Sequence, residues 1–134
     1  MNRNKRLAII IPVWGSYCDI LINNTFKSFL LKENIAYFDK DIDVIRILTS
    51  KIDSKKIDQS EIVKSLRKYI KIEIIENYID NNISKYKIAS MLHEKGLNKH
   101  PLYKYAMMHH PDDCITNGTI KFILENIKKY KLIM

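Results

Sequence analysis

Glycine and proline are rare in this sequence: each accounts for only three of its 134 residues. The phosphate-binding signatures G-x-G-x-x-G and G-x-x-x-x-G-K-[ST] do not occur, and the nucleophile motif G-x-S-x-G is absent too. A phosphate site cradled by a glycine-rich loop is therefore excluded. The scarcity of both residues, together with an apolar content of 46%, predicts a folded domain rather than a disordered chain.

Cysteine and long apolar runs are also scarce. Cys18 and Cys114 lie far apart and form no C-x-x-C pair, which favours two free thiols in a reducing compartment. The apolar run at residues 7–13 is too short for a signal or membrane helix, and no small-residue cleavage site follows it. We therefore expect a cytoplasmic protein.

Acidic residues are outnumbered by basic ones, 15 to 23, which gives a net charge of +8. A basic surface attracts anionic ligands and the anionic inner face of a membrane, so peripheral membrane contact stays open. The abundant lysine accompanies abundant isoleucine, which indicates an A/T-rich codon bias. Because the sequence has neither a helix-turn-helix pattern nor a basic aromatic motif, we expect no nucleic-acid partner.

Apolar segments predict the strands of a sheet. They lie at residues 7–13, 42–48, 70–75 and 102–108, with a short fifth strand at residues 131–134. Continuous β-branched runs are typical of parallel strands that are covered on both faces. The alternating pattern of residues 70–75 instead indicates a more exposed strand near an edge of the sheet.

Helical stripes of apolar residues separate these strands. They predict helices from residue 16 or 19 to Asn34, from 58 to 70, from Ser84 to about Lys95 with Gly96 as its C′ residue, and from Asn117 onward. Residues 51–56 are expected to form a polar loop, and Tyr86 is expected to face inward. The alternation of strands and helices predicts a single domain over residues 1–134, a three-layer α/β/α fold with a mostly parallel sheet of four to five strands.

Polar and aromatic residues follow three of the predicted strands, where parallel sheets bind ligands. Trp14 would stack on a planar base, Ser50 or Asp53 would bond a base or ribose, and Asp112 with Asp113 would hold a divalent cation that bridges a diphosphate. Each residue also has a structural alternative that stays open. Trp14 would then be a packing lid, Asp53 a solvated side chain, and the two aspartates the charges of a turn or of a helix N-terminus.

The four histidines do not predict a zinc site. His109 and His110 stand close to two aspartates, but neighbouring residues of a strand point to opposite faces and would not easily share one metal ion. No H-x-x-x-H spacing occurs. His93 is expected to be a half-exposed histidine on a helix.

The order of these segments resembles bacterial glycosyltransferases with the GT-A (nucleotide-diphospho-sugar transferase) fold. The resemblance rests on residues 9–15 (IIIPVWG), 25–35 (TFKSFLLKENI), 47–53 (ILTSKID), 86–93 (YKIASMLH) and 110–119 (HPDDCITNGT). It implies that the nucleotide is bound by Pro12, Val13, Trp14, Thr49, Ser50 and Asp53. It also implies that Asp112, supported by Asp113, binds Mg²⁺ or Mn²⁺ and the diphosphate, although the family usually has D-x-D in place of Pro-Asp-Asp.

The resemblance covers only the donor-binding half of such an enzyme, since the sequence ends where the acceptor-binding half of the family begins. That second half normally supplies the catalytic base. We therefore expect a truncated GT-A domain that binds a nucleotide-diphospho-sugar, with self-association or an acceptor-domain partner chain completing it. Whether the chain itself transfers a hexosyl group stays open. The alternative is a non-catalytic interaction or regulatory module that keeps the α/β scaffold.

Overall fold

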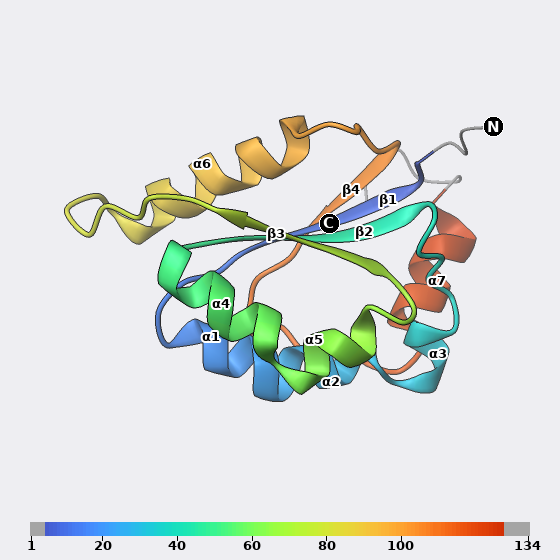
Figure 1. The fold of residues 1–134 in the computed structure, drawn as a ribbon. Helices are drawn as coiled ribbons and strands as arrows, with labels where there is room; N and C mark the ends of the chain where they lie inside the picture. The colour runs from blue at the N-terminus through green and yellow to red at the C-terminus, as the bar shows by residue number, and fades with distance from the viewer. Residues whose placement is uncertain (1–4, 128–134) are drawn as a thin grey trace.

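A parallel sheet forms the centre of the molecule. The computed structural model describes residues 5–127. Its four strands are β1 (Leu7–Pro12), β2 (Asp43–Thr49), β3 (Lys71–Glu76) and β4 (Tyr105–Met108), all parallel and in the order β3-β2-β1-β4. Helices cover both faces of the sheet (Figure 1), which confirms the predicted three-layer α/β/α fold. The strand predicted at residues 131–134 lies outside the described residues.

The central strands are β1 and β2. Every residue in both is buried, as expected for parallel strands that are covered on two faces. Most of β3 is partly or fully exposed, which confirms its predicted place at an edge. The strand expected from residue 102 begins only at Tyr105, and β4 borders β1 on the side opposite β2.

Two helical layers pack on the sheet. The layer below the sheet in Figure 1 consists of α1 (Tyr17–Ile20), a π-helical turn η1 (Leu21–Thr25), α2 (Phe26–Phe29), α3 (Lys32–Ile35), α4 (Lys51–Gln59), α5 (Glu61–Leu66) and α7 (Thr119–Asn126). On the other face lies α6 (Lys85–Asn98). Residues of β1 alternate between the layers: Ile9 and Ile11 join the larger buried cluster, whereas Ile10 packs with residues of α6. None of the helices within residues 5–127 has both the length and the apolarity needed to cross a bilayer.

The helix expected to end at Asn34 is interrupted. The chain passes from α1 through the π-helical turn η1 into α2, and it leaves helical geometry at Leu31, where ψ is 145°. The buried Asn34 side chain donates to the carbonyl oxygen of Ser28 at 2.9 Å. This bond provides a partner near the end of α2, where backbone carbonyls lack helical partners.

The prediction of a polar loop at residues 51–56 is wrong, because these residues form the first part of α4. Ser50 is the N-cap, and its Oγ accepts a hydrogen bond from the backbone N–H of Asp53 at 3.1 Å. The sequence looked like a loop because only Ser54 and Ile57 of α4 are buried and most of its other residues are exposed.

Two expectations for α6 are wrong, although its predicted N-cap, Ser84, is confirmed. Gly96 lies inside the helix rather than after it, because α6 crosses closely over β1. A Cβ at residue 96 would lie 2.6 Å from Cγ2 of Ile10, so the backbone approach requires a glycine here. Tyr86 is not buried but 76% exposed.

Both cysteines are free, as predicted: Cys18 is buried and Cys114 is exposed. Burial raises the pKa of the Cys18 thiol to about 11. The Cys18 side chain is therefore protonated at neutral pH and serves as a small apolar group in the larger core cluster.

Candidate functional site

A pocket of about 340 Å³ lies at the carboxyl ends of β1 and β4. The strands β1, β2 and β3 follow one another across the sheet, and α6 then carries the chain back over β1 to β4 on the opposite side. The order of the strands therefore reverses between β1 and β4, and open parallel sheets bind ligands at this point. The pocket receives residues from the end of β1, from α6 and from the loop after β4.

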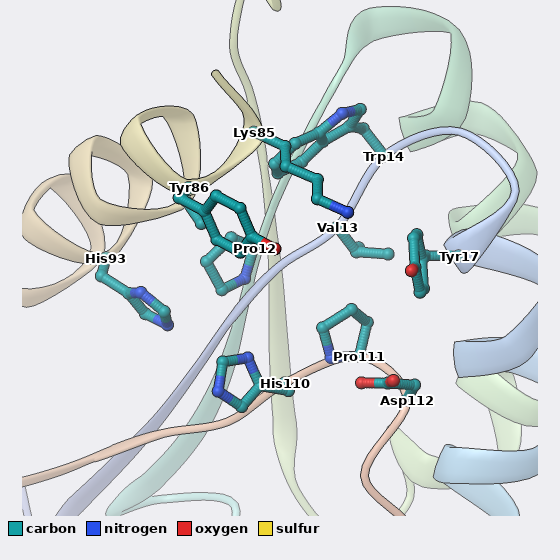
Figure 2. Close-up of a pocket in the computed structure, with 11 residues that line it drawn as sticks. Pro12, Val13, Trp14, Tyr17, Lys85, Tyr86, His93, His110, Pro111 and Asp112 are labelled. Carbon is teal, nitrogen blue, oxygen red and sulfur yellow. The ribbon is translucent and has the colours of Figure 1, made fainter.

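The pocket combines aromatic and charged side chains. Trp14 and Tyr17 reach it from the segment after β1, and Tyr86 borders it from α6. Figure 2 shows the ammonium group of Lys85 extending toward the space that Asp112 borders from the loop after β4. The pocket therefore offers surfaces for stacking, one positive charge and one carboxylate.

The sequence predicted part of this set. The pocket is lined by four of the predicted residues, Pro12, Val13, Trp14 and Asp112. They were predicted because parallel sheets bind ligands at the carboxyl ends of their strands. The other four predicted residues do not line the pocket. Thr49 is fully buried at the end of β2, Ser50 caps α4, Asp53 lies in the first turn of α4, and Asp113 is exposed in the loop after β4.

Asp53 does not line the pocket, but its carboxylate stabilises the turn beside it. Its Oδ2 accepts hydrogen bonds from the backbone N–H of Gly15 at 3.0 Å and from the hydroxyl of Ser50 at 2.7 Å. Gly15 has a φ of +68°, a conformation that favours glycine. The carboxylate thus holds the turn that follows Trp14 against the N-terminus of α4.

The contributions of α6 were missed by the sequence interpretation. Lys85 and Tyr86 occupy the first turn of α6, and His93 lies two turns further along. A helix that connects parallel strands runs opposite to them, so its first turn lies at their carboxyl ends. The predicted N-cap at Ser84 was therefore a usable signal that the following residues border the ligand-binding edge.

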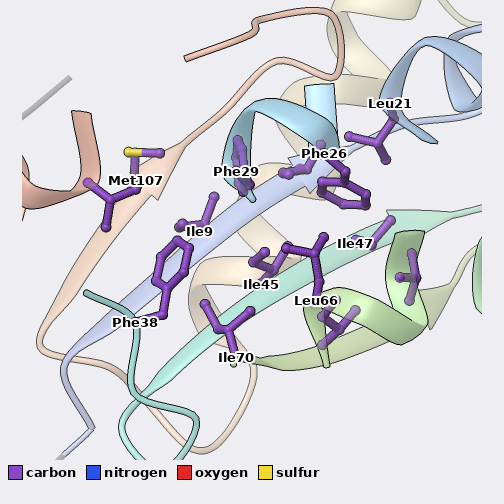
Figure 3. Close-up of a cluster of buried hydrophobic side chains, with 14 of the residues drawn as sticks. Ile9, Leu21, Phe26, Phe29, Phe38, Ile45, Ile47, Leu66, Ile70 and Met107 are labelled. Carbon is purple, nitrogen blue, oxygen red and sulfur yellow. The ribbon is translucent and has the colours of Figure 1, made fainter. Parts of the chain in front are cut away.

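Polar side chains of the η1–α3 segment hold the loop that carries Asp112. The hydroxyl of Thr25 donates to the carbonyl oxygen of Pro111 at 2.6 Å, and the hydroxyl of Ser28 accepts from the backbone N–H of Ile115 at 3.0 Å. The same segment packs Phe26 and Phe29 into the core against β1 (Figure 3). The position of Asp112 is thus tied directly to the hydrophobic core.

The two histidines at the end of β4 point to opposite sides, as predicted. His109 is buried, its ring centroid lies 5.3 Å from that of Phe29, and its Nε2 donates to the backbone oxygen of Asp113 at 2.7 Å. His110 is exposed and lines the pocket. His109 therefore shapes the loop, whereas His110 borders the ligand space.

Burial of His109 predicts a pH-dependent stability. Desolvation lowers the pKa of His109 below its ordinary value, although its bond to the oxygen of Asp113 acts in the opposite direction. Below about pH 6.5 the unfolded state then binds more protons than the folded state, so the free energy of unfolding should fall as the pH decreases toward 5.5. Urea unfolding of the wild type at several pH values in this interval measures the slope.

Two variants, His109→Phe and His100→Phe, test whether His109 causes this pH dependence of the free energy of unfolding. The first removes the buried imidazole, and the second replaces a histidine that is exposed. We expect His109→Phe to reduce the pH dependence more than His100→Phe does. Equal slopes in the two variants would contradict the assignment to His109.

The chain's own contribution to a metal site is small. Within residues 5–127 no group of three or more His, Cys, Asp or Glu side chains has an arrangement that could hold a metal ion. Mg²⁺ is commonly bound by one or two carboxylates, with phosphate oxygens and water as the remaining ligands. The single carboxylate of Asp112 in the pocket fits such a shared site.

No family model, curated protein or solved structure matches this chain.

Proposed function

We propose that the pocket between β1 and β4 binds the nucleotide-diphospho part of a nucleotide sugar, as the donor site of a GT-A-like glycosyltransferase does. One observation carries the proposal: the reversal of strand order brings Trp14, Lys85 and Asp112 to one pocket at the carboxyl ends of the strands. Its volume of about 340 Å³ falls in the usual range of small-molecule sites.

Each of these side chains matches one part of the ligand. The indole of Trp14 offers an aromatic face for the base. The ammonium group of Lys85 offsets part of the negative charge of the diphosphate. Asp112 is itself anionic, so it would contact the diphosphate through a divalent cation such as Mg²⁺ or Mn²⁺ rather than directly. The cation would neutralise the phosphate oxygens, and Asp112 would fix its place.

The proposal predicts that nucleotide binding depends on a divalent cation and on Asp112. In calorimetry against uridine diphosphate and guanosine diphosphate, Asp112→Asn should weaken binding in Mg²⁺ at least about tenfold, or about 1.4 kcal/mol. Excess chelator should weaken binding to the wild type by a similar factor. The free energy of unfolding should change by less than about 0.5 kcal/mol, because Asp112 is exposed.

Asp113→Asn is the matched control, since this exposed neighbour lies outside the pocket. We expect a smaller loss of affinity in this variant. Equal binding in Mg²⁺ and in chelator would contradict the role of the cation, and equal losses in the two variants would contradict the specific role of Asp112. The absence of heat and of a thermal shift at millimolar nucleotide would favour a non-catalytic module that keeps the scaffold.

A further inference from the structure

His93 presents a polar atom that the proposed nucleotide contacts leave unused. The side chain lies on α6 and lines the pocket. Its Nε2 is buried and has no hydrogen-bond partner within the described part of the chain. Buried polar atoms of folded proteins are nearly always hydrogen-bonded, so an unpaired nitrogen beside a pocket calls for a ligand group.

The hydrogen bond of the other ring nitrogen determines what this ligand group must be. The ring bonds to the backbone of Ala89, one turn earlier on α6, in a contact that favours the protonated ring. The partner is a carbonyl oxygen, so the nitrogen that faces it carries a proton. Desolvation by burial lowers the pKa of His93, with the nearby His110 as a further cause, and this favours the neutral ring. A neutral ring with its proton at Nδ1 leaves Nε2 as an acceptor.

An acceptor at Nε2 can bind only those parts of a nucleotide sugar that donate a hydrogen bond. Phosphate oxygens of the diphosphate carry no proton at neutral pH and cannot donate to Nε2. Figure 2 shows Trp14 and the two histidines at opposite ends of the pocket, so a base that stacks on Trp14 is remote from His93. Hydroxyl groups are donors: those of the ribose lie next to the base, whereas those of the sugar lie beyond the diphosphate from the base.

We propose that Nε2 of His93 accepts a hydrogen bond from a hydroxyl of the sugar in a bound nucleotide-diphospho-sugar. The inference rests on the proposed function, since it assigns the sugar end of the same site. Nε2 is buried in the structure, so a sugar hydroxyl reaches it only after a neighbouring side chain moves. His110 is exposed and borders the same space, and exposed side chains change rotamer on a fast timescale.

The test compares a nucleotide sugar with its nucleotide. Uridine diphosphate glucose and uridine diphosphate, or guanosine diphosphate mannose and guanosine diphosphate, are titrated in Mg²⁺ into the wild type, His93→Phe and His93→Gln. The preference for the sugar form, given as the ratio of the two dissociation constants, should fall about tenfold in His93→Phe. It should partly return in His93→Gln, whose amide oxygen is an acceptor.

The exposed His100, which does not line the pocket, provides the matched control His100→Phe, and thermal unfolding checks that each variant is folded. An unchanged ratio in folded His93→Phe would overturn the inference and leave the proposed function intact. An equal loss of affinity for both ligands would place Nε2 on the nucleotide and overturn the assignment to the sugar. No binding of either ligand to the wild type would overturn the proposed function, and this inference with it.

Discussion

Replacement of Asn34 by alanine is expected to lower the free energy of unfolding by about 2–4 kcal/mol, because it leaves several buried polar groups unpaired. The Asn34 side chain is fully buried. Its Nδ2 donates to the carbonyl oxygens of Ser28 at 2.9 Å and Thr116 at 3.0 Å. Its Oδ1 accepts from the backbone N–H groups of Gly118 at 3.2 Å and Ile120 at 3.0 Å. One amide therefore joins the end of α2 to the segment that begins α7.

Urea unfolding of Asn34→Ala measures this loss, and Asn24→Ala is its matched control. Asn24 lies in η1, is exposed, and should change stability by less than about 0.5 kcal/mol. Because the same contacts anchor the loop with Asp112, nucleotide affinity should also fall in Asn34→Ala. A loss of stability similar to that of Asn24→Ala would show that water replaces the amide and that the network contributes little.

The two central strands could be predicted because apolar residues dominate them. Ile9 and Ile45 of the two central strands meet Phe26 and Phe29 of the helical layer in one buried cluster (Figure 3). Burial on both faces favours apolar residues at successive positions, and this pattern is visible without any knowledge of the partner elements, although β2 also buries Arg46. The strand order was not visible, since the pairing of β1 with β4 joins segments about a hundred residues apart.

The wrong predictions concern segments whose structure depends on tertiary contacts more than on the local sequence pattern. Gly96 looked like a helix end, but it is a site of close approach between α6 and β1, which only the packed structure reveals. Residues 51–56 looked like a loop, although the side chain of Ser50 starts a helix there. A polar sequence on a mostly exposed helix carries the same composition as a loop, so composition alone could not separate them.

The sequence predicted the pocket residues that follow β1 and β4 and missed those of α6. Trp14 lies shortly after β1 and Asp112 lies in the loop after β4, so both were located by the expectation that parallel sheets bind ligands at the carboxyl ends of their strands. Lys85 and His93 belong to the crossover helix, and their relation to the pocket depends on which way α6 crosses the sheet. Asp53 was predicted as a ligand residue, and its hydrogen bond to Gly15 now gives it a supporting role in the turn beside Trp14.

Arg46 is expected to show the largest loss of stability upon mutation. This residue of β2 is 1% exposed, and all three of its guanidinium nitrogens donate hydrogen bonds. Nη1 donates to the carbonyl oxygen of Gly96 at 2.9 Å, Nη2 to that of Pro101 at 2.6 Å, and Nε to the Glu73 carboxylate at 3.3 Å. The guanidinium also lies 4.9 Å from the ring centroid of Tyr103. One side chain thus connects the end of α6 and the segment before β4 to the sheet.

Arg46→Ala removes a buried partner from these groups and should lower the free energy of unfolding by about 3–5 kcal/mol. Arg46→Met fills more of the same volume and should therefore lose less stability. In this variant the packing is largely kept, whereas the two carbonyl groups still lose their hydrogen-bond donor. Arg67→Ala is the matched control, because Arg67 forms an ion pair with Asp58 on the surface at 2.6 Å. Exposed pairs contribute at most about 1 kcal/mol. If Arg46→Ala lost no more stability than Arg67→Ala in urea unfolding, the end of α6 would be held by its apolar face on β1 alone.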